Sequence, residues 1–367
     1  MSDSSANGTA AQRAVSQLGR YRLLRSLGMG GMAEAFKASY SGPGGFERTV
    51  VVKRILPANC EDPEFVRMFM AEAKILGMLH HPNVVQVYDF GESEGSLFLV
   101  LEYVDGPSLG RLLKALRNAK RPMPLAIAAH FGHEVCRALD YVHGLRTSDG
   151  EAMNVIHRDV TPSNVVLTST GSVKLLDFGI AKYAASEANT EHHTIKGKPA
   201  YLAPEIIEGY PFDGRSDLFS LGVILYEALT LAPLFVGDTD LSTLHRVLEM
   251  PIAPPSWART DVPTELDSIV MKALERDPAR RFASAAQMGR ALEEFVVASK
   301  LRNDDVVEFL RDAEPLMPIP RGTLPGIAAA PSMGTMPTAP EAEDTKLDLG
   351  LRIRMSPLGR LFGSREK

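Results

Sequence analysis

Apolar and polar residues alternate in short runs over much of the first hundred residues. Such runs, bounded by glycine-rich or charged turns, predict β-strands. They cover residues 21–27, 33–39, 49–56, 84–90 and 97–104. One helix interrupts them, because Asp62 and Pro63 provide a cap and a first-turn proline and apolar residues then recur at helical spacing. These apolar positions are Phe65, Met68, Phe69, Ile75, Leu76 and Leu79.

Helical spacing of the apolar positions dominates from residue 126 onward, for example over residues 126–143, 218–229, 265–274 and 285–301. The longest apolar stretch, residues 219–236, is interrupted by Glu227 and Pro233. It therefore predicts a buried helix followed by a turn and no membrane span. The pattern as a whole predicts a small β-rich lobe joined to a larger helical lobe.

Both ends of the chain differ from this pattern. Residues 1–20 are small and polar and lack the apolar core of a signal peptide, so we expect a disordered leader. Residues 315–345 are rich in Pro, Gly, Ala and Thr, which indicates a flexible linker. In the basic tail 346–367, residues 346–356 alternate strictly between apolar and other residues. This predicts a strand that adds to a sheet edge, on its own small lobe or on a partner, with a disordered tail as the open alternative.

Composition narrows the class of protein. The chain has 367 residues, 45% of them hydrophobic, and a formal net charge of only −5. That balance fits a soluble globular protein and disfavours polyanion binding as the main role, so neither nucleic acid nor a membrane is expected as a partner. Two cysteines, Cys60 and Cys136, are too few for a disulfide framework or a structural zinc site, which favours the cytoplasm.

The first candidate for chemistry is the run Gly28-Met29-Gly30-Gly31, which lies between two predicted strands. A glycine-rich turn of this kind can place backbone N–H groups over phosphates. Taken alone, an ordinary glycine turn in a hairpin is the commoner explanation.

A second candidate pair is formed by Lys53 and Glu72. Lys53 shares one strand face with Val51 and Ile55, and Glu72 falls within the apolar stripe of the following helix. A carboxylate in a buried stripe needs a partner, and Lys53 is the obvious one.

Three further side chains follow in a strand-loop-strand segment: Asp159, Asn164 and Asp177. They supply one potential base and two hard oxygen ligands suited to Mg²⁺. Each short match could arise by chance, but their order after the glycine turn and Lys53 could hardly do so.

With these motifs in that order, residues 21–297 resemble a protein kinase domain of the bacterial serine/threonine type. The resemblance implies an α+β, bilobal fold with a small antiparallel β-sheet lobe (21–101), a hinge (102–108) and a large helical lobe (109–297). A helical extension is expected over residues 298–314.

The resemblance also implies roles for individual residues. Lys53, paired with Glu72, would hold the ATP phosphates under Gly28, Gly30 and Gly31, with Asp159 as the catalytic aspartate and Asn164 and Asp177 as the Mg²⁺ ligands. The adenine site would comprise Leu27, Ala35, Val51, Leu101, Val104, Val166 and the main chain of Glu102. Glu205 is expected to pair with Arg281, and Asp217 to brace the catalytic loop.

The implied function is transfer of the ATP γ-phosphoryl group to serine or threonine hydroxyls of proteins, with autophosphorylation, in bacterial signalling. A pseudokinase that serves as a nucleotide-binding scaffold is the alternative. Lys53, Glu72, Asp159, Asn164 and Asp177 are all retained, which disfavours it. Thr194, three residues before Gly197, is the expected activating phosphorylation site, and Arg158 the cation that would bind the phosphate.

Two paired departures from the family pattern stand out. Ala35 and Val51 have exchanged the sizes usual at these adenine-site positions, which conserves volume. Thr161 stands where the family has a catalytic-loop lysine, and Lys198 stands where it has an activation-segment threonine. The second exchange predicts that Lys198 reaches toward Asp159 and supplies the charge from the other side.

Overall fold

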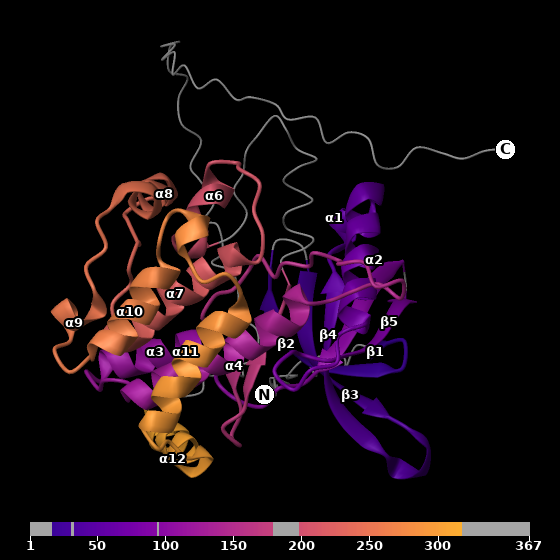
Figure 1. Ribbon diagram of the computed structural model, residues 1–367. Coiled ribbons are helices and arrows are strands. Elements are labelled where there is room, and N and C mark those ends of the chain that lie inside the picture. Colours follow the sequence, from indigo (N-terminus) through magenta and orange to yellow (C-terminus); the bar gives the residue numbers. More distant parts are fainter. Residues whose placement is uncertain (1–16, 31–32, 94, 179–197, 318–367) are drawn as a thin grey trace, which may run out of the picture. The chain divides into compact units, whose positions relative to one another are not determined.

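An antiparallel six-stranded sheet in the order β1-β2-β3-β4-β6-β5 forms most of the small lobe (Figure 1). The structure, a computed structural model, describes residues 17–30, 33–93, 95–178 and 198–317. Gly31, Thr194 and the predicted strand 346–356 lie outside the described residues. The strands are β1 Gln17–Leu18, β2 Tyr21–Met29, β3 Ala33–Ser41, β4 Glu47–Ile55, β5 Val87–Ser93 and β6 Ser96–Glu102.

The sheet starts before the expected boundary at residue 21. Leu18 pairs with Tyr21 across a two-residue turn, and Gly19 takes a positive φ of 56° there, which glycine adopts without strain. Leu18 is also buried in the same apolar cluster as Tyr21. Gln17 and Leu18, which were expected to belong to the disordered leader, therefore form a strand, because burial of Leu18 stabilises it.

The sheet is curled, because its two ends are joined by polar contacts. Tyr21, at the start of β2, donates from its hydroxyl to Asp89 Oδ2 of β5 at 2.7 Å, and Arg20 Nη2 contacts the same oxygen at 2.7 Å. These residues belong to opposite sides of the strand order. The contact brings β5 close to the beginning of the sheet.

One strand differs from its prediction. A strand was expected over residues 84–90, but β5 begins at Val87. Val84 instead forms an isolated bridge with Leu175, and Val85 N–H donates to the Leu175 carbonyl at 3.0 Å. The apolar run is thus divided between the two lobes, which alternation along the chain does not reveal.

Helices build the large lobe, with one main helix in the small lobe (Figure 1). The small lobe carries α1 Pro57–Cys60 and α2 Pro63–Gly77. The large lobe contains α3 Leu109–Asn118, α4 Leu125–His143, α6 Pro204–Ile207, α7 Arg215–Thr230, α8 Asp240–Glu249, α9 Pro255–Ala258, α10 Thr264–Ala273, α11 Ala285–Ala298 and α12 Asn303–Ala313. A short hairpin, β7 Val165–Leu167 with β8 Val173–Leu175, lies between α4 and α6 in sequence.

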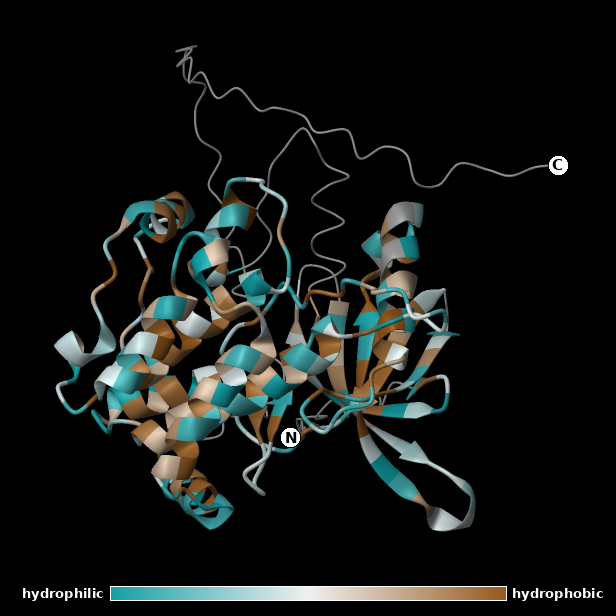
Figure 2. Cartoon of the chain, in the orientation of Figure 1, coloured by the Kyte–Doolittle hydropathy of each residue, from teal (hydrophilic) through white to brown (hydrophobic). Residues whose placement is uncertain are grey.

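The apolar stretch at 219–236 forms the centre of the large lobe, as predicted. Residues from Ser216 to Leu229 of α7 are all buried, and the helix ends where Leu231 takes a left-handed φ of 57°. Figure 2 shows hydrophobic residues concentrated around α7 and hydrophilic residues on the outer sides of the surrounding helices. Among the described residues, no helix is both long and apolar enough to cross a membrane.

The helical extension after the expected domain end contributes to the same core. Helix α11 ends at Ala298, earlier than the expected residue 301, because Lys300 takes a left-handed φ of 54°. Helix α12 then buries Val306, Phe309, Leu310 and Ala313 in the main apolar cluster. Arg111 of α3 donates to the Met317 carbonyl, which ties the end of the described chain to the helix that follows the hinge.

Candidate active site

The ammonium of Lys53 forms an ion pair between the lobes. Lys53 is on β4, opposite Leu99 of β6, and its Nζ donates to Asp177 Oδ1 at 2.9 Å. Burial alone would lower the pKa of Lys53, but the charges of Asp177 and Glu72 outweigh burial and raise it. Glu72, expected as the partner of Lys53 on the helix, is buried on α2, and its charge favours the protonated ammonium.

Asp217, at the start of α7, holds the backbone of the loop that carries Asp159. Its two carboxylate oxygens accept the N–H groups of His157 and Arg158, each at 2.9 Å. Arg158 has a positive φ of 65°, a conformation that costs a non-glycine residue about 1–2 kcal/mol. The two bonds to a buried carboxylate offset that cost, so the bracing role expected for Asp217 is present. His143 of α4 also contacts Asp217, at 2.8 Å, a contact that no sequence pattern indicated.

The side chain of Asn164 fixes Asp159. Its Nδ2 donates to Asp159 Oδ2 and to the Asp159 carbonyl, both at 2.8 Å. Because the amide nitrogen is used in this way, the remaining polar atom of the Asn164 side chain is its acceptor oxygen. The Leu176 N–H donates to the Asn164 carbonyl at 2.7 Å, which joins this loop to the segment that carries Asp177.

His157 also connects the loop that carries Asp159 to the segment that carries Asp177. Its Nε2 bonds the Leu176 carbonyl at 2.9 Å, and the Asp159 N–H donates to its Nδ1 at 3.3 Å. A carbonyl only accepts, so Nε2 carries the proton and Nδ1 is the acceptor. Burial lowers the pKa of His157, which agrees with a neutral ring. Its ring packs against Phe178, with centroids 4.4 Å apart.

An apolar cavity lies between the sheet and the large lobe beside Asp177. Its walls are Val51, Val85, Leu101, Tyr103, Val104 and Leu176, together with Glu102 and Asp177. The carboxylate of Glu102 points elsewhere, since Oε2 pairs with Lys174 Nζ at 2.8 Å, so Glu102 can serve the cavity only through its main chain. Leu27, Ala35 and Val166 belong to the same buried apolar cluster as Val51.

Lys198 and Thr161 both contact a third residue, Ser163. Lys198 Nζ donates to Ser163 Oγ, and that oxygen lies 3.1 Å from Thr161 Oγ1. Thr161 and Ser163 are both buried. Proximity of Lys198 and Thr161 was expected, but Ser163 was not, because no spacing or periodicity distinguishes it.

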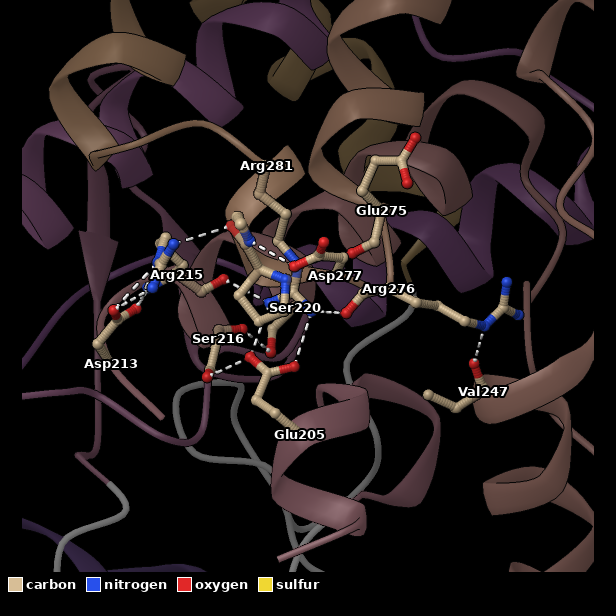
Figure 3. A network of polar contacts seen from close by, with 12 residues as sticks. Glu205, Asp213, Arg215, Ser216, Ser220, Val247, Glu275, Arg276, Asp277 and Arg281 are labelled. Carbon is tan, nitrogen blue, oxygen red and sulfur yellow. Dashed lines mark hydrogen bonds and ion pairs between the residues drawn. The ribbon is translucent and has the colours of Figure 1, made fainter. Parts of the chain in front are cut away.

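A buried ion pair supports the activation-segment end (Figure 3). Arg281 Nη1 and Nη2 donate to Glu205 Oε1 and Oε2, each at 2.7 Å, and Ser216 Oγ donates to Oε1 at 2.6 Å. The remaining guanidinium bonds go to main-chain carbonyls of residues 215, 275 and 276. The pairing of Glu205 with Arg281 expected from the sequence is thus observed.

Comparison with known families agrees with this geometry. The model described as "Protein kinase domain" matches residues 21–292. The chain belongs to the protein kinase domain family. Kinases of this family use ATP and a divalent metal and act on protein substrates. The α+β, bilobal kinase fold is confirmed.

Named kinases are similar over most of this chain. "Tyrosine-protein kinase MasK" of Myxococcus xanthus is 41% identical over 278 residues, which cover 76% of this chain and 43% of that protein. "Serine/threonine-protein kinase PknB" of Mycobacterium leprae is 38% identical over 275 residues, which cover 73% and 42%. The chain thus spans less than half the length of these curated relatives.

A solved kinase structure has the same fold. The Mycobacterium tuberculosis PknI kinase domain has a TM-score of 0.57 and 29% sequence identity, and the match covers 77% of this chain and 99% of that one. This likeness agrees with the protein kinase fold, and the name of the similar PknB agrees with assignment to the bacterial serine/threonine kinase type.

The exchange of side-chain sizes between Ala35 and Val51 in the predicted adenine site leads to a testable prediction. Val51 faces the apolar cavity, so Val51→Ala removes two methyl groups there and leaves a void. We expect ATP binding to weaken by about 1 kcal/mol, roughly fivefold in Kd, measured by isothermal titration calorimetry.

A matched control is the next residue on the strand. Val52→Ala removes the same two methyl groups, but Val52 belongs to the apolar cluster on the other side of the sheet. Its ATP affinity should stay within experimental error of wild type. Equal or tighter ATP binding by Val51→Ala would contradict the role of Val51.

Proposed function

We propose that this chain is a serine/threonine protein kinase that transfers the γ-phosphoryl group of ATP to hydroxyls of protein substrates in bacterial signalling. The observation that carries the proposal is the ion pair between Lys53 Nζ and Asp177 Oδ1 at 2.9 Å, next to an Asp159 that Asn164 holds in place. A pseudokinase scaffold would not need all these groups together, so it is disfavoured. We also propose that the protein acts in the cytoplasm, as expected from its sequence.

The residues present fit Mg²⁺ and ATP. The Asn164 side-chain oxygen and the Asp177 carboxylate are hard oxygen ligands from adjacent segments, suited to Mg²⁺. Within the described ranges no three His, Cys, Asp or Glu side chains gather into a metal site. Proteins commonly hold Mg²⁺ by one or two side chains together with phosphate oxygens, so the oxygens of Asn164 and Asp177 would suffice. The metal would neutralise phosphate charge.

The protein's own residues do the remaining work. Lys53 neutralises and orients the phosphates, the apolar cavity excludes water from the adenine side, and Asp159 accepts the proton of the substrate hydroxyl. Because most of the catalysis is positioning, the bracing of the loop by Asp217 and Asn164 contributes directly to the rate.

The direct test is incubation of the full chain with ATP, MgCl₂ and a generic protein acceptor, followed by phosphoamino acid analysis. We expect phosphoserine or phosphothreonine, and loss of transfer on addition of EDTA. Phosphotyrosine alone would contradict the acceptor class, a distinction worth making because MasK is named a tyrosine kinase. ATP binding without transfer would favour the pseudokinase.

Within this function we propose that Lys198 supplies the ammonium that the family usually carries at the position of Thr161. The supporting contact is the hydrogen bond from Lys198 Nζ to Ser163 Oγ, one residue before Asn164 in the catalytic loop. Because Lys198 precedes the turn Pro199–Tyr201 of the activation segment, its charge reaches the loop only when that segment is docked.

An exchange of residues tests this role. Lys198→Thr and Thr161→Lys should each lower turnover about tenfold or more, and the double exchange should recover part of the loss. Turnover is measured at saturating ATP. A Lys198→Thr variant near wild type, or a double exchange no better than the worse single variant, would show that the two residues do not compensate each other.

We also propose Thr194 as the autophosphorylation site, with Arg158 as the cation that would bind the phosphate. The guanidinium of Arg158 lies over the ring of Phe212, 5.2 Å from its centroid, on the large lobe. For residues 346–356 we still predict a strand that adds to a sheet edge, either on the small lobe of this chain or on a partner.

A further inference from the structure

We infer that Ser163 is a positioning residue, which holds the Lys198 ammonium against the catalytic loop through its hydroxyl group. The inference rests on the role proposed above for Lys198 and adds the residue through which that role would operate.

The contact joins two segments that are far apart in sequence. Ser163 is buried, with 7% exposure, in the catalytic loop, whereas Lys198 is the first described residue of the activation-segment end. Its Nζ donates to Ser163 Oγ. Because the Ser163 side chain is buried, its hydroxyl has few alternative hydrogen-bond partners. It can therefore fix the position of the ammonium at the end of the long, flexible Lys198 side chain.

The position of Ser163 links this contact to the catalytic aspartate. Ser163 directly precedes Asn164, whose Nδ2 donates to Asp159 Oδ2 at 2.8 Å. On its other side, Ser163 Oγ lies 3.1 Å from Thr161 Oγ1. Lys198, Ser163 and Thr161 thus form a chain of polar contacts directly beside the groups that hold Asp159.

The chemistry of a serine suits this task. An ammonium has donors only, so Ser163 Oγ must accept from Lys198. A hydroxyl is neutral, so this contact orients the ammonium without cancelling the charge needed at the phosphates. A carboxylate at the same place would form an ion pair with Lys198 and compete with phosphate for it.

Among the described residues, Glu227 of α7 is an acidic group whose charge interacts with that of Lys198. Burial raises the pKa of Glu227, although Tyr201, whose hydroxyl donates to Oε2 at 2.9 Å, and the charge of Lys198 oppose the rise. The charge of Glu227 attracts the ammonium, whereas the hydrogen bond to Ser163 Oγ places it at the catalytic loop. Removal of the Ser163 hydroxyl should therefore let Lys198 move away from Asp159.

Three variants of the full chain separate these effects. Ser163→Ala should lower kcat about tenfold while KM for ATP stays within twofold, because the charge is misplaced and not lost. Ser163→Thr keeps the hydroxyl and should retain most of the activity. Ser163→Glu should lower kcat further than Ser163→Ala, because the new carboxylate pairs with Lys198.

A double-variant cycle shows whether Ser163 acts through Lys198. In a Lys198→Thr background, Ser163→Ala should have little additional effect on kcat. Hydrogen exchange of the segment 198–207 should rise in Ser163→Ala and remain as in wild type in Ser163→Thr.

The failures of the two proposals are distinguishable. A Lys198→Thr variant near wild type would reject the catalytic role of Lys198 itself. An impaired Lys198→Thr together with an unchanged Ser163→Ala would overturn the present inference alone. Additive losses in the double variant would also overturn it, because Ser163 would then act independently of Lys198.

Discussion

Replacement of Asp159 by Asn is expected to lower the turnover of phosphoryl transfer by about 10²–10⁴-fold. The asparagine keeps the shape of the side chain and an oxygen that can accept from Asn164 Nδ2, but it cannot take the proton of the substrate hydroxyl. ATP affinity should therefore change little, so the loss should appear in kcat. Both quantities are measurable, by steady-state kinetics and by calorimetry.

A matched control is Asp149→Asn, which makes the same chemical change at an exposed loop position. It should transfer phosphate at the wild-type rate. Equal phosphate incorporation by Asp159→Asn and wild type would overturn the enzymatic function, whereas loss of ATP binding in Asp159→Asn would show that Asp159 has a structural role instead.

Replacement of Arg281 by Met is expected to lower the free energy of unfolding by about 3–5 kcal/mol. Arg281 and Glu205 are each only 4% exposed, and removal of the guanidinium leaves the Glu205 carboxylate buried without its bidentate partner. Urea denaturation followed by circular dichroism measures this change.

The neighbouring Arg280 provides the control, because its side chain is 73% exposed. Arg280→Met should change the free energy of unfolding by less than about 0.5 kcal/mol. A double variant that also replaces Glu205 by Met should recover part of the loss, because no charge then stays buried. Equal stability of Arg281→Met and Arg280→Met would contradict this account.

The stabilisation by this pair should depend on pH. Burial would raise the pKa of Glu205, but hydrogen bonds from Arg281 and Ser216 outweigh it and lower the pKa below the ordinary value of 4.5. A carboxyl with a lowered folded-state pKa contributes its stability above the unfolded-state pKa and loses it as pH falls through the folded-state pKa. The difference in unfolding free energy between wild type and the double variant Arg281→Met/Glu205→Met, which has no carboxyl to titrate at this position, should therefore be constant at about pH 6–8 and shrink under acidic conditions, below about pH 4.5.

Much of the architecture could be predicted from local patterns. Alternation predicted β2, β3, β4 and β6 to within about two residues at each end, and helical spacing predicted α2, α4 and α10 equally well and α7 to within three residues. The sequence also predicted on which face of its helix or strand a residue lies. Glu72 is buried within the apolar stripe of α2, and Lys53 lies on the cavity side of β4. These features depend on the period of each element, which neighbouring residues in the chain determine.

Contacts between distant segments were decided only by the tertiary structure. Lys53 donates a hydrogen bond to Asp177, 124 residues further on, a contact that the expected pairing with Glu72 did not include. The run 84–90 is divided, because Val84 and Val85 pair with Leu175 of the other lobe. Leu18 joins the sheet because its side chain is buried in the apolar cluster around Tyr21.

In the candidate site, too, the sequence determined some features and the tertiary structure decided others. Motif order along the sequence determined which residue types are available for phosphoryl transfer, including the unusual pair Thr161 and Lys198. The place of the Lys198 ammonium was decided by Ser163, whose burial and distance from Thr161 depend on how two segments dock. A side chain's period follows from its own helix or strand, whereas its hydrogen-bond partner depends on which distant groups the fold brings within about 3 Å.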